Sequence, residues 1–238
     1  MRLAVSKCAI FFLFSLVVSE SKAQLVVEGS IGLARNSFFH FDLENQNTSL
    51  DPKFGIISSI GVKRMIKEDI YARLGVLFHQ FKMGYRTENI DGRESFGRDL
   101  EIEALFLGGR VGFQQVLNKD SDFKISILFN FTFGQQVANR VSGSTFAFVP
   151  KIISGPDDET FTVFVRDETQ FDSEAYEQIR SFYFGSDLGI MLEYPISQRV
   201  HLQFHTLYFV SLTSFFGEAP PNLLRNSINA ELGVGLRL

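Results

Sequence analysis

The feature that most constrains this chain is a two-residue alternation of apolar and polar side chains along most of its length. The closing stretch, SINAELGVGLRL, places Ile228 and Leu232 on one face of an extended strand and Glu231 on the other. Successive side chains of a strand point to opposite faces, so this period favours β-strands over helices. Such strands can enclose the core of a soluble sheet, or they can face lipid in a membrane barrel.

Eight segments carry the alternation, and we expect each to form one strand. In one of them, residues 100–117, the apolar set changes from even-numbered to odd-numbered positions. A single β-bulge near Leu107 to Gly109 would reconcile the two halves. The eight segments are 25–33, 54–62, 70–78, 100–117, 123–133, 182–194, 200–210 and 227–238.

The connections between these segments alternate between long and short. Short polar turns lie around RMIKED, NKDSD and PISQ, and the long connections span residues 34–53, 86–97, 141–179 and 213–225. Outer-membrane barrels have short periplasmic turns and long outer loops, whereas a soluble sandwich or lipocalin has no reason to sort its loops. The sequence therefore predicts an all-β fold, an eight-stranded antiparallel up-and-down transmembrane β-barrel. Pairing of 227–238 with 25–33 would close it and leave no edge.

The first residues have the layout of a secretory signal. Arg2 and Lys7 precede an apolar run from Ala9 to Val18, and small and polar residues lead to Ala23. This run is shorter than the ~20 residues that a membrane helix needs, so we expect cleavage after Ala23 rather than a retained anchor. The predicted organisation is a signal peptide at 1–23 and one outer-membrane barrel domain at 24–238.

Composition excludes several function classes for residues 24–238. This part has no cysteine, which excludes a disulfide scaffold, a thiol nucleophile and a zinc-thiolate site. The full chain has 23 Lys and Arg against 27 Asp and Glu, and without residues 1–23 the balance is 20 against 26, a net charge of −6. A chain of this charge is a poor nucleic-acid binder, because phosphate contacts need a basic patch.

Nine charged residues fall on the predicted inner face near the short turns. An eight-stranded barrel is only wide enough to be filled by its own side chains. We therefore expect a structural ion-pair plug, with a proton or ion path as the alternative. The nine are Glu28, Lys63, Arg73, Arg110, Lys124, Asp187, Glu193, Glu231 and Arg237.

Histidines supply the candidates for chemistry. His201 and His205 share one face of their strand, and His79 stands alone on the inner face. A metal site would need a third ligand, which no spacing supplies. His40 and Asp42 in FFHFD are the nearest hint of a rim hydrolase, but a base needs a nucleophile or water within hydrogen-bond reach. We predict no catalytic residue, cofactor or metal.

The connection 141–178 is the most distinctive one. It holds eight carboxylates against Lys151 and Arg166, a balance of −6. STFAFVPKII and TFTVFVRD flank SGPDDE, which predicts a hairpin above the membrane. Its edge could receive a partner strand. The alternatives are an acidic loop that is only solvated and a loop that contacts divalent cations.

The stretch LEIEALFLGGRVGF at 100–113, the start ending in AQ and the closing ELGVGLRL resemble small outer-membrane β-barrel proteins of Bacteroidetes. This is the porin-family or PorT-like group, with a barrel of the OmpX/OmpA type. The resemblance implies a place in the outer membrane, among lipid and lipopolysaccharide. We expect a monomeric, non-enzymatic structural or interaction protein that works through its outer loops, with a possible protein partner there. The alternatives are a barrel enzyme acting on outer-membrane lipid or peptide, and a narrow transport pore.

Overall fold

Ten strands make up the part of the chain that the computed structural model describes. The predicted signal peptide, residues 1–23, lies outside this part. No helix in the described ranges is long and apolar enough to cross a membrane. The described ranges are 25–40, 47–91, 94–118, 120–154, 160–174, 179–215 and 223–238.

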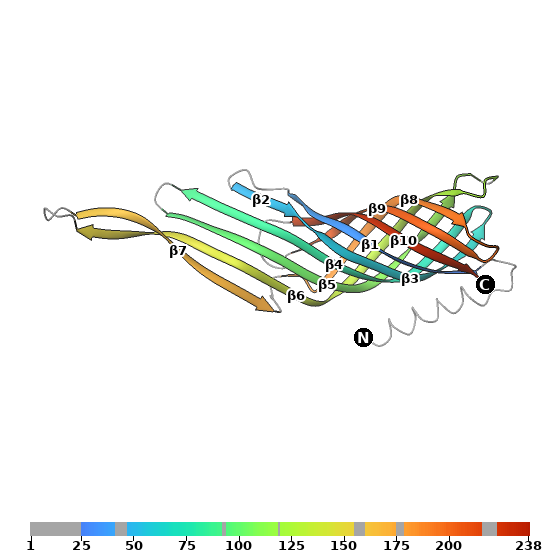
Figure 1. Ribbon diagram of the computed structural model, residues 1–238, viewed down its shortest axis with the longest axis horizontal. Helices are drawn as coiled ribbons and strands as arrows, with labels where there is room; N and C mark the ends of the chain where they lie inside the picture. Colours follow the sequence, from blue (N-terminus) through green and yellow to red (C-terminus); the bar gives the residue numbers. More distant parts are fainter. Residues whose placement is uncertain are drawn as a thin grey trace.

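Eight of the ten strands form a closed antiparallel barrel, and β2 and β7 extend it at one end (Figure 1). The circuit runs β1, β3, β4, β5, β6, β8, β9, β10 and back to β1. The strands are β1 (Leu25–His40), β2 (Asn47–Pro52), β3 (Phe54–Lys67), β4 (Ile70–Asp91), β5 (Glu94–Val116), β6 (Lys124–Ser154), β7 (Thr160–Glu174), β8 (Phe182–Pro195), β9 (Val200–Ser214) and β10 (Leu223–Arg237).

Pairing of the first and last strands closes the barrel, as the sequence predicts. β1 and β10 are antiparallel, and Val26 faces Arg237 at one end of their ladder while His40 faces Leu223 at the other. The backbone N–H of Leu238 donates to the carbonyl of Leu25 at 3.0 Å. The last strand therefore has no free edge, which explains why the alternation continues to the end of the chain.

Three short connections lie at the same end as Leu25 and Leu238, and we call this the short-turn end. They join β3 to β4, β5 to β6 and β8 to β9. In the first, Asp69 adopts a φ of 67°, a left-handed conformation that Asp tolerates better than most residues. The predicted sorting of short and long connections is confirmed.

At the opposite end the strands run beyond their predicted limits. β4 ends at Asp91 and β5 begins at Glu94, so most of the predicted loop 86–97 is a hairpin. β6 continues to Ser154 and pairs with β7, which confirms the hairpin within 141–178. The predicted loop boundaries are wrong because a polar segment can prolong a ladder that a neighbouring strand already supports.

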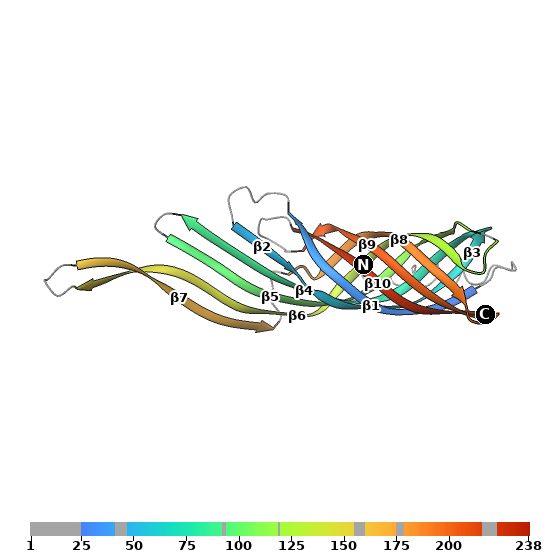
Figure 2. The same cartoon turned by 45° about the horizontal axis from the view of Figure 1, so that its top comes forward.

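These prolonged strands form an open sheet beyond the barrel, with the order β2, β4, β5, β6, β7. We call it the outer sheet. Figures 1 and 2 show it rising far past the ends of β8, β9 and β10, so the barrel wall is much taller on one side. Its tallest part is a two-stranded ribbon, here called the outer ribbon, which consists of residues 140–154 of β6 and 160–174 of β7.

Toward the short-turn end the barrel is polar inside and apolar outside, the reverse of a soluble protein. On β6, Phe129 and Phe131 are exposed on the outer face, whereas Asn130 and Thr132 are buried in the lumen. Exposed Ile, Leu, Val and Phe side chains continue around the other barrel strands. A band of this kind is expected where a barrel surface contacts lipid. The chain is therefore a small β-barrel of the outer-membrane type.

One predicted irregularity lies on a different strand. Leu105 pairs with Ala138 and Phe106 with Gln136, so the extra residue is Val137 of β6. The predicted bulge near Leu107 to Gly109 of β5 is therefore wrong. β5 keeps one phase, and its inner face changes from apolar side chains in the outer half to polar ones near the short-turn end. From the sequence alone, an inner face that changes from apolar to polar side chains looks the same as a bulge that moves the apolar side chains to the other face.

Candidate functional site

The lower half of the lumen holds the predicted ion pairs. Arg73 donates from Nε to Glu28 at 2.9 Å. Lys63 Nζ lies 2.6 Å from Glu193. Each of these pairs joins strands that are far apart in sequence, and all four residues are buried. The pairing of the inward charges is thus confirmed for these two cations.

A third cation neutralises two carboxylates near the middle of the barrel. Arg110 Nε lies 3.1 Å from Asp187, and its Nη2 lies 3.3 Å from Glu231. β5, β8 and β10 supply the three residues, so one guanidinium connects three strands across the lumen. Buried charges persist only when they are paired and hydrogen-bonded, and this arrangement meets that condition.

The remaining two predicted charges lie at the short-turn end. Lys124 and Arg237 are half-buried and line a cavity of about 270 Å³ together with Tyr71, Gln114 and His201. They therefore border an open vestibule and do not belong to the buried plug. The sequence places them on the correct face, but it does not give their depth along the barrel axis.

The histidines point into the lumen, as predicted, and they do not meet. His201 Nδ1 lies 3.5 Å from Glu193, and His79 Nε2 lies 3.1 Å from the side-chain oxygen of Asn36. Within the described ranges, no three His, Cys, Asp or Glu side chains are grouped so that they could hold a metal ion. His40 ends β1 opposite Leu223, and Asp42 lies outside the described residues.

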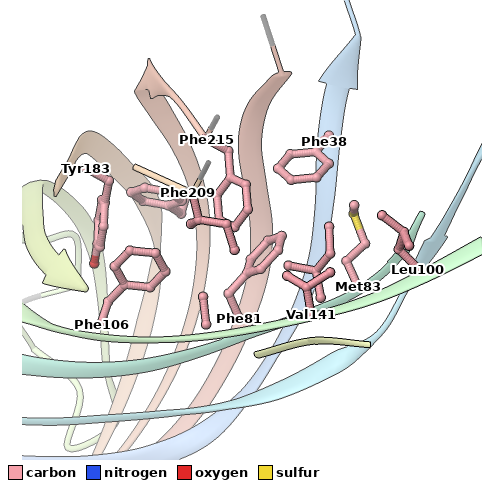
Figure 3. Close-up of a cluster of buried hydrophobic side chains, with 12 residues drawn as sticks. Phe38, Phe81, Met83, Leu100, Phe106, Val141, Tyr183, Phe209 and Phe215 are labelled. Carbon is pink, nitrogen blue, oxygen red and sulfur yellow. The ribbon is translucent and has the colours of Figure 1, made fainter. Parts of the chain in front are cut away.

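Above the ion pairs, apolar side chains fill the lumen, which the sequence did not indicate. The rings of Phe81 and Phe215 are 4.7 Å apart, and Phe106 meets Tyr183 edge-on at 5.0 Å (Figure 3). In the sequence, apolar side chains that face the lumen follow the same two-residue period as those that face lipid, so the pattern does not distinguish them. We call this cluster the lumen core; its members are Phe38, Phe81, Met83, Leu100, Ile102, Ala104, Phe106, Val141, Ile179, Tyr183, Phe209 and Phe215.

One charged residue that sequence reasoning missed lies inside the lumen core. The sequence places Arg225 in the last long connection, but β10 begins at Leu223 and the side chain of Arg225 is buried in the lumen. Its guanidinium lies 4.1 Å from the centre of the Tyr183 ring and 4.7 Å from that of Phe209. The sequence does contain an indication of this position. Arg225 lies two residues before Ser227 and four before Asn229, so it falls on the same inward face of an extended strand.

The outer ribbon is the second candidate site, and its charges are partly paired. Arg140 donates from Nε to Asp172 at 2.9 Å, and this hydrogen bond lowers the pKa of the Asp172 carboxyl. Arg166 lies 3.0 Å from Glu168 and stacks over the ring of Phe146 at 4.1 Å. These contacts lie on one face of the ribbon, since their residues are even-numbered and the strands are antiparallel in register.

The opposite face of the ribbon is exposed in the described residues and carries apolar side chains toward its tip. Val149 faces Val165 in the ladder, and both are more than two-fifths exposed. Ile153 lies on the same face and is also exposed. Asp167 and Thr169 continue the face toward the barrel and are exposed as well. This face is therefore mainly apolar toward the tip, where Lys151 also lies, and polar toward the barrel, where Asp167 lies.

Both edges of the outer ribbon lack a neighbouring strand in the described pairings. Pairing of β6 with β5 ends at Ala147, so residues 148–154 have one open side. β7 pairs with β6 alone along its whole length. An edge strand exposes a row of unpaired backbone N–H and C=O groups, which another extended chain can join.

No family model matches the chain, and neither does any curated protein sequence. Among solved structures, it is similar to Neisserial surface protein A, with 15% identity, 92% of this chain and 100% of that chain covered, and a TM-score of 0.40. It is also similar to Ail, the attachment invasion locus protein of Yersinia pestis, with 11% identity, 90% and 98% coverage, and a TM-score of 0.33. OprG of Pseudomonas aeruginosa has 9% identity, 91% and 96% coverage, and a TM-score of 0.36. Likeness at this level carries no inference about function.

Proposed function

We propose that this barrel is a monomeric, non-enzymatic interaction protein of the outer membrane. In this proposal, residues 1–23 direct export and the barrel anchors the chain in lipid. The outer ribbon then binds a partner polypeptide by strand addition. The observation that carries the proposal is the edge of β7: among the described strands, β7 pairs only with β6 over Thr160–Glu174. Membership of the porin-family or PorT-like group of Bacteroidetes is part of the proposal and rests on the strand residues at 100–113.

The two edges of the ribbon are not equally available. The open part of β6 contains Pro150, which lacks a backbone N–H, followed by the exposed Lys151. Proline and lysine are devices that discourage strand addition at an edge. β7 contains neither between Thr160 and Glu174. We therefore assign the partner strand to the β7 edge.

The chemistry of the ribbon defines the partner strand. β7 carries four carboxylates against Arg166, and the segment 141–178 as a whole has a charge of −6. On the face opposite the ion pairs, the apolar Val149 and Val165 lie beside the acidic Asp167. A complementary strand alternates apolar residues with Lys or Arg, so that one set covers the valines and the other meets the carboxylates.

The lumen favours anchoring over transport. Buried ion pairs occupy its lower half, and the lumen core fills the part above them. A narrow pore would need a continuous wet path through both layers. We therefore expect the protein to show no ion conductance in planar bilayers. We also expect no nucleic-acid binding, since the exported chain is acidic.

Selection of peptides by the folded protein tests the proposed binding. A variant without the ribbon is available from the register: replacing residues 145–169 by Asn-Gly joins Ser144 to Gln170, which face each other in the ladder. Random linear peptides are panned on the detergent-folded protein and counter-selected on this variant. We expect the enriched peptides to alternate apolar and basic residues and to slow hydrogen exchange in β7.

A charge variant is the matched control for the peptide selection. Replacing Asp167 by Asn and Glu168 by Gln keeps the shape of β7 and removes two charges. We expect weaker peptide binding with a smaller dependence on salt. Peptides that bind the variant without the ribbon equally well would contradict the proposal, as would enrichment with no preference for basic residues.

A further inference from the structure

Arg225 differs from the other buried cations of the lumen. Its side chain is 1% exposed, and its guanidinium lies 4.1 Å from the ring of Tyr183 and 4.7 Å from that of Phe209, two members of the lumen core. Lys63, Arg73 and Arg110 each have a carboxylate within 4 Å. Within the described ranges, Arg225 has none. A buried charge without a counter-charge is strongly unfavourable, so this position calls for an anionic partner.

The polar groups of Arg225 and Tyr183 lack regular hydrogen bonds. Within the described ranges, Nε, Nη1 and Nη2 of Arg225 and the hydroxyl of Tyr183 form no hydrogen bond of regular geometry, although the hydroxyl lies close enough to the guanidinium to interact with it. Rings surround the guanidinium at 4.1 Å (Tyr183), 4.7 Å (Phe209) and 5.0 Å (Phe106). Aromatic faces attract the positive charge, but they do not supply lone pairs in the plane of the N–H groups.

A small cavity adjoins these donors. It has about 10 Å³ of free volume and is lined by Arg180, Tyr183, Ser211, Thr213, Phe215 and Arg225. This volume is close to the minimum for one water-sized group. Arg180 and Phe182 are exposed where the cavity reaches the surface near the outer rim. A small solute can therefore enter from outside without crossing the ion-pair layer.

We propose that this cavity binds one small monovalent anion of halide size. The anion would accept hydrogen bonds from the Arg225 guanidinium and the Tyr183 hydroxyl and would neutralise the buried charge. Water could fill the same space, but it would leave the charge of Arg225 uncompensated. The inference is independent of partner binding at the outer ribbon.

Halide-dependent stability tests this site directly. The full chain is folded in detergent in sodium gluconate, and gluconate is replaced stepwise by chloride or bromide at constant ionic strength, which keeps screening constant. An anion that binds only the folded state raises the Tm in a saturable manner. We expect this rise for the wild type, together with saturable broadening of the chloride NMR line. Absence of both effects would overturn the proposal.

Variants assign the effect to the cavity. Arg225→Met keeps a long apolar side chain among the rings and should abolish the halide response. Arg140→Met removes an exposed arginine on the outer ribbon and should leave the response unchanged. If Arg225→Met fails to fold, Tyr183→Phe decides, because it removes one donor. Loss of one hydrogen bond corresponds to about two- to ten-fold weaker halide binding.

Two further outcomes would overturn the assignment. An unchanged halide affinity in Tyr183→Phe would place the anion elsewhere, as would a normal response in Arg225→Met. Formate is tested as a third anion besides chloride and bromide, because its carboxylate mimics the carboxylate group of a larger ligand. Stabilisation by formate without any effect of bromide would replace the halide with a carboxylate.

Discussion

At the scale of single residues, the stability of the lumen depends on buried charges that are tolerated only when each has a counter-charge. Arg73 and Glu28 are both buried, and each supplies the counter-charge of the other across β4 and β1. Replacing a buried ion pair by apolar residues can be neutral, whereas removing one partner leaves a buried charge without compensation. The two kinds of substitution should therefore have very different costs.

Removal of the Glu28 charge is the corresponding prediction. We expect Glu28→Gln to lower the free energy of unfolding by about 3–5 kcal/mol, because Arg73 stays buried and unpaired. The double variant Glu28→Gln with Arg73→Met should lose much less than the sum of the single variants. Urea unfolding in lipid vesicles measures both values. Glu101→Gln is the control, since its pair with Lys53 is exposed and should contribute less than about 1 kcal/mol. Equal losses at Glu28 and Glu101 would refute the role of burial.

At the scale of elements, β6 is a single strand with two environments. Its lower part is flanked by β5 and β8 in the barrel, and its upper part belongs to the outer ribbon. Gly143 lies at the base of the ribbon with a φ of 144°, which side chains rarely adopt. A Cβ atom there would lie 2.0 Å from the carbonyl oxygen of Asp99. Only glycine fits where β6 leaves the barrel wall.

Substitution of this glycine should loosen the ribbon. We expect Gly143→Ala to cost about 1–3 kcal/mol of local stability, since both the backbone and the contact with Asp99 are strained. Hydrogen exchange should accelerate in residues 144–154 while residues 126–136 stay protected. Gly29→Ala is the matched control, because the nearest atom to its added Cβ is 3.8 Å away. Unchanged exchange in Gly143→Ala would show that the base of the ribbon tolerates a side chain.

At the scale of the whole molecule, exposed apolar side chains occur in two settings. Ile190 is 53% exposed on the barrel wall, and Val165 is 43% exposed on the outer ribbon. If the wall contacts lipid and the ribbon stands in water, the same exposure has different consequences. A charge is costly in the hydrocarbon layer, whereas it is well solvated in water.

An arginine scan of two positions separates these settings. We expect Ile190→Arg to destabilise the barrel in lipid vesicles by about 2–4 kcal/mol. Val165→Arg should change the stability by less than about 0.5 kcal/mol, as at an ordinary surface position. The free energy of unfolding from vesicles gives both values. A similar effect at the two sites would mean that lipid does not cover the wall.

The sequence by itself determined the strands, their sidedness and the closure between residues 25–33 and 227–238. Alternation is a local property of an extended chain, and the lengths of the turns decide which strands are neighbours. It also placed Glu28, Lys63 and Arg73 on the inner face, because one phase runs through each of these strands. The sequence did not reveal how far β4, β5 and β6 extend beyond the barrel, since polar residues are compatible with a β-ladder and with a loop.

Only the tertiary structure decided which inward side chains meet. The depth of a residue in the lumen depends on the tilt and stagger of all eight strands, which no single segment encodes. Stagger brings Arg110 to both Asp187 and Glu231, whereas it leaves Arg225 among aromatic rings. It also turns Leu100 and Phe106 into the lumen core. Alternation cannot distinguish a lipid-facing apolar series from one that faces an enclosed core, because both follow the same period.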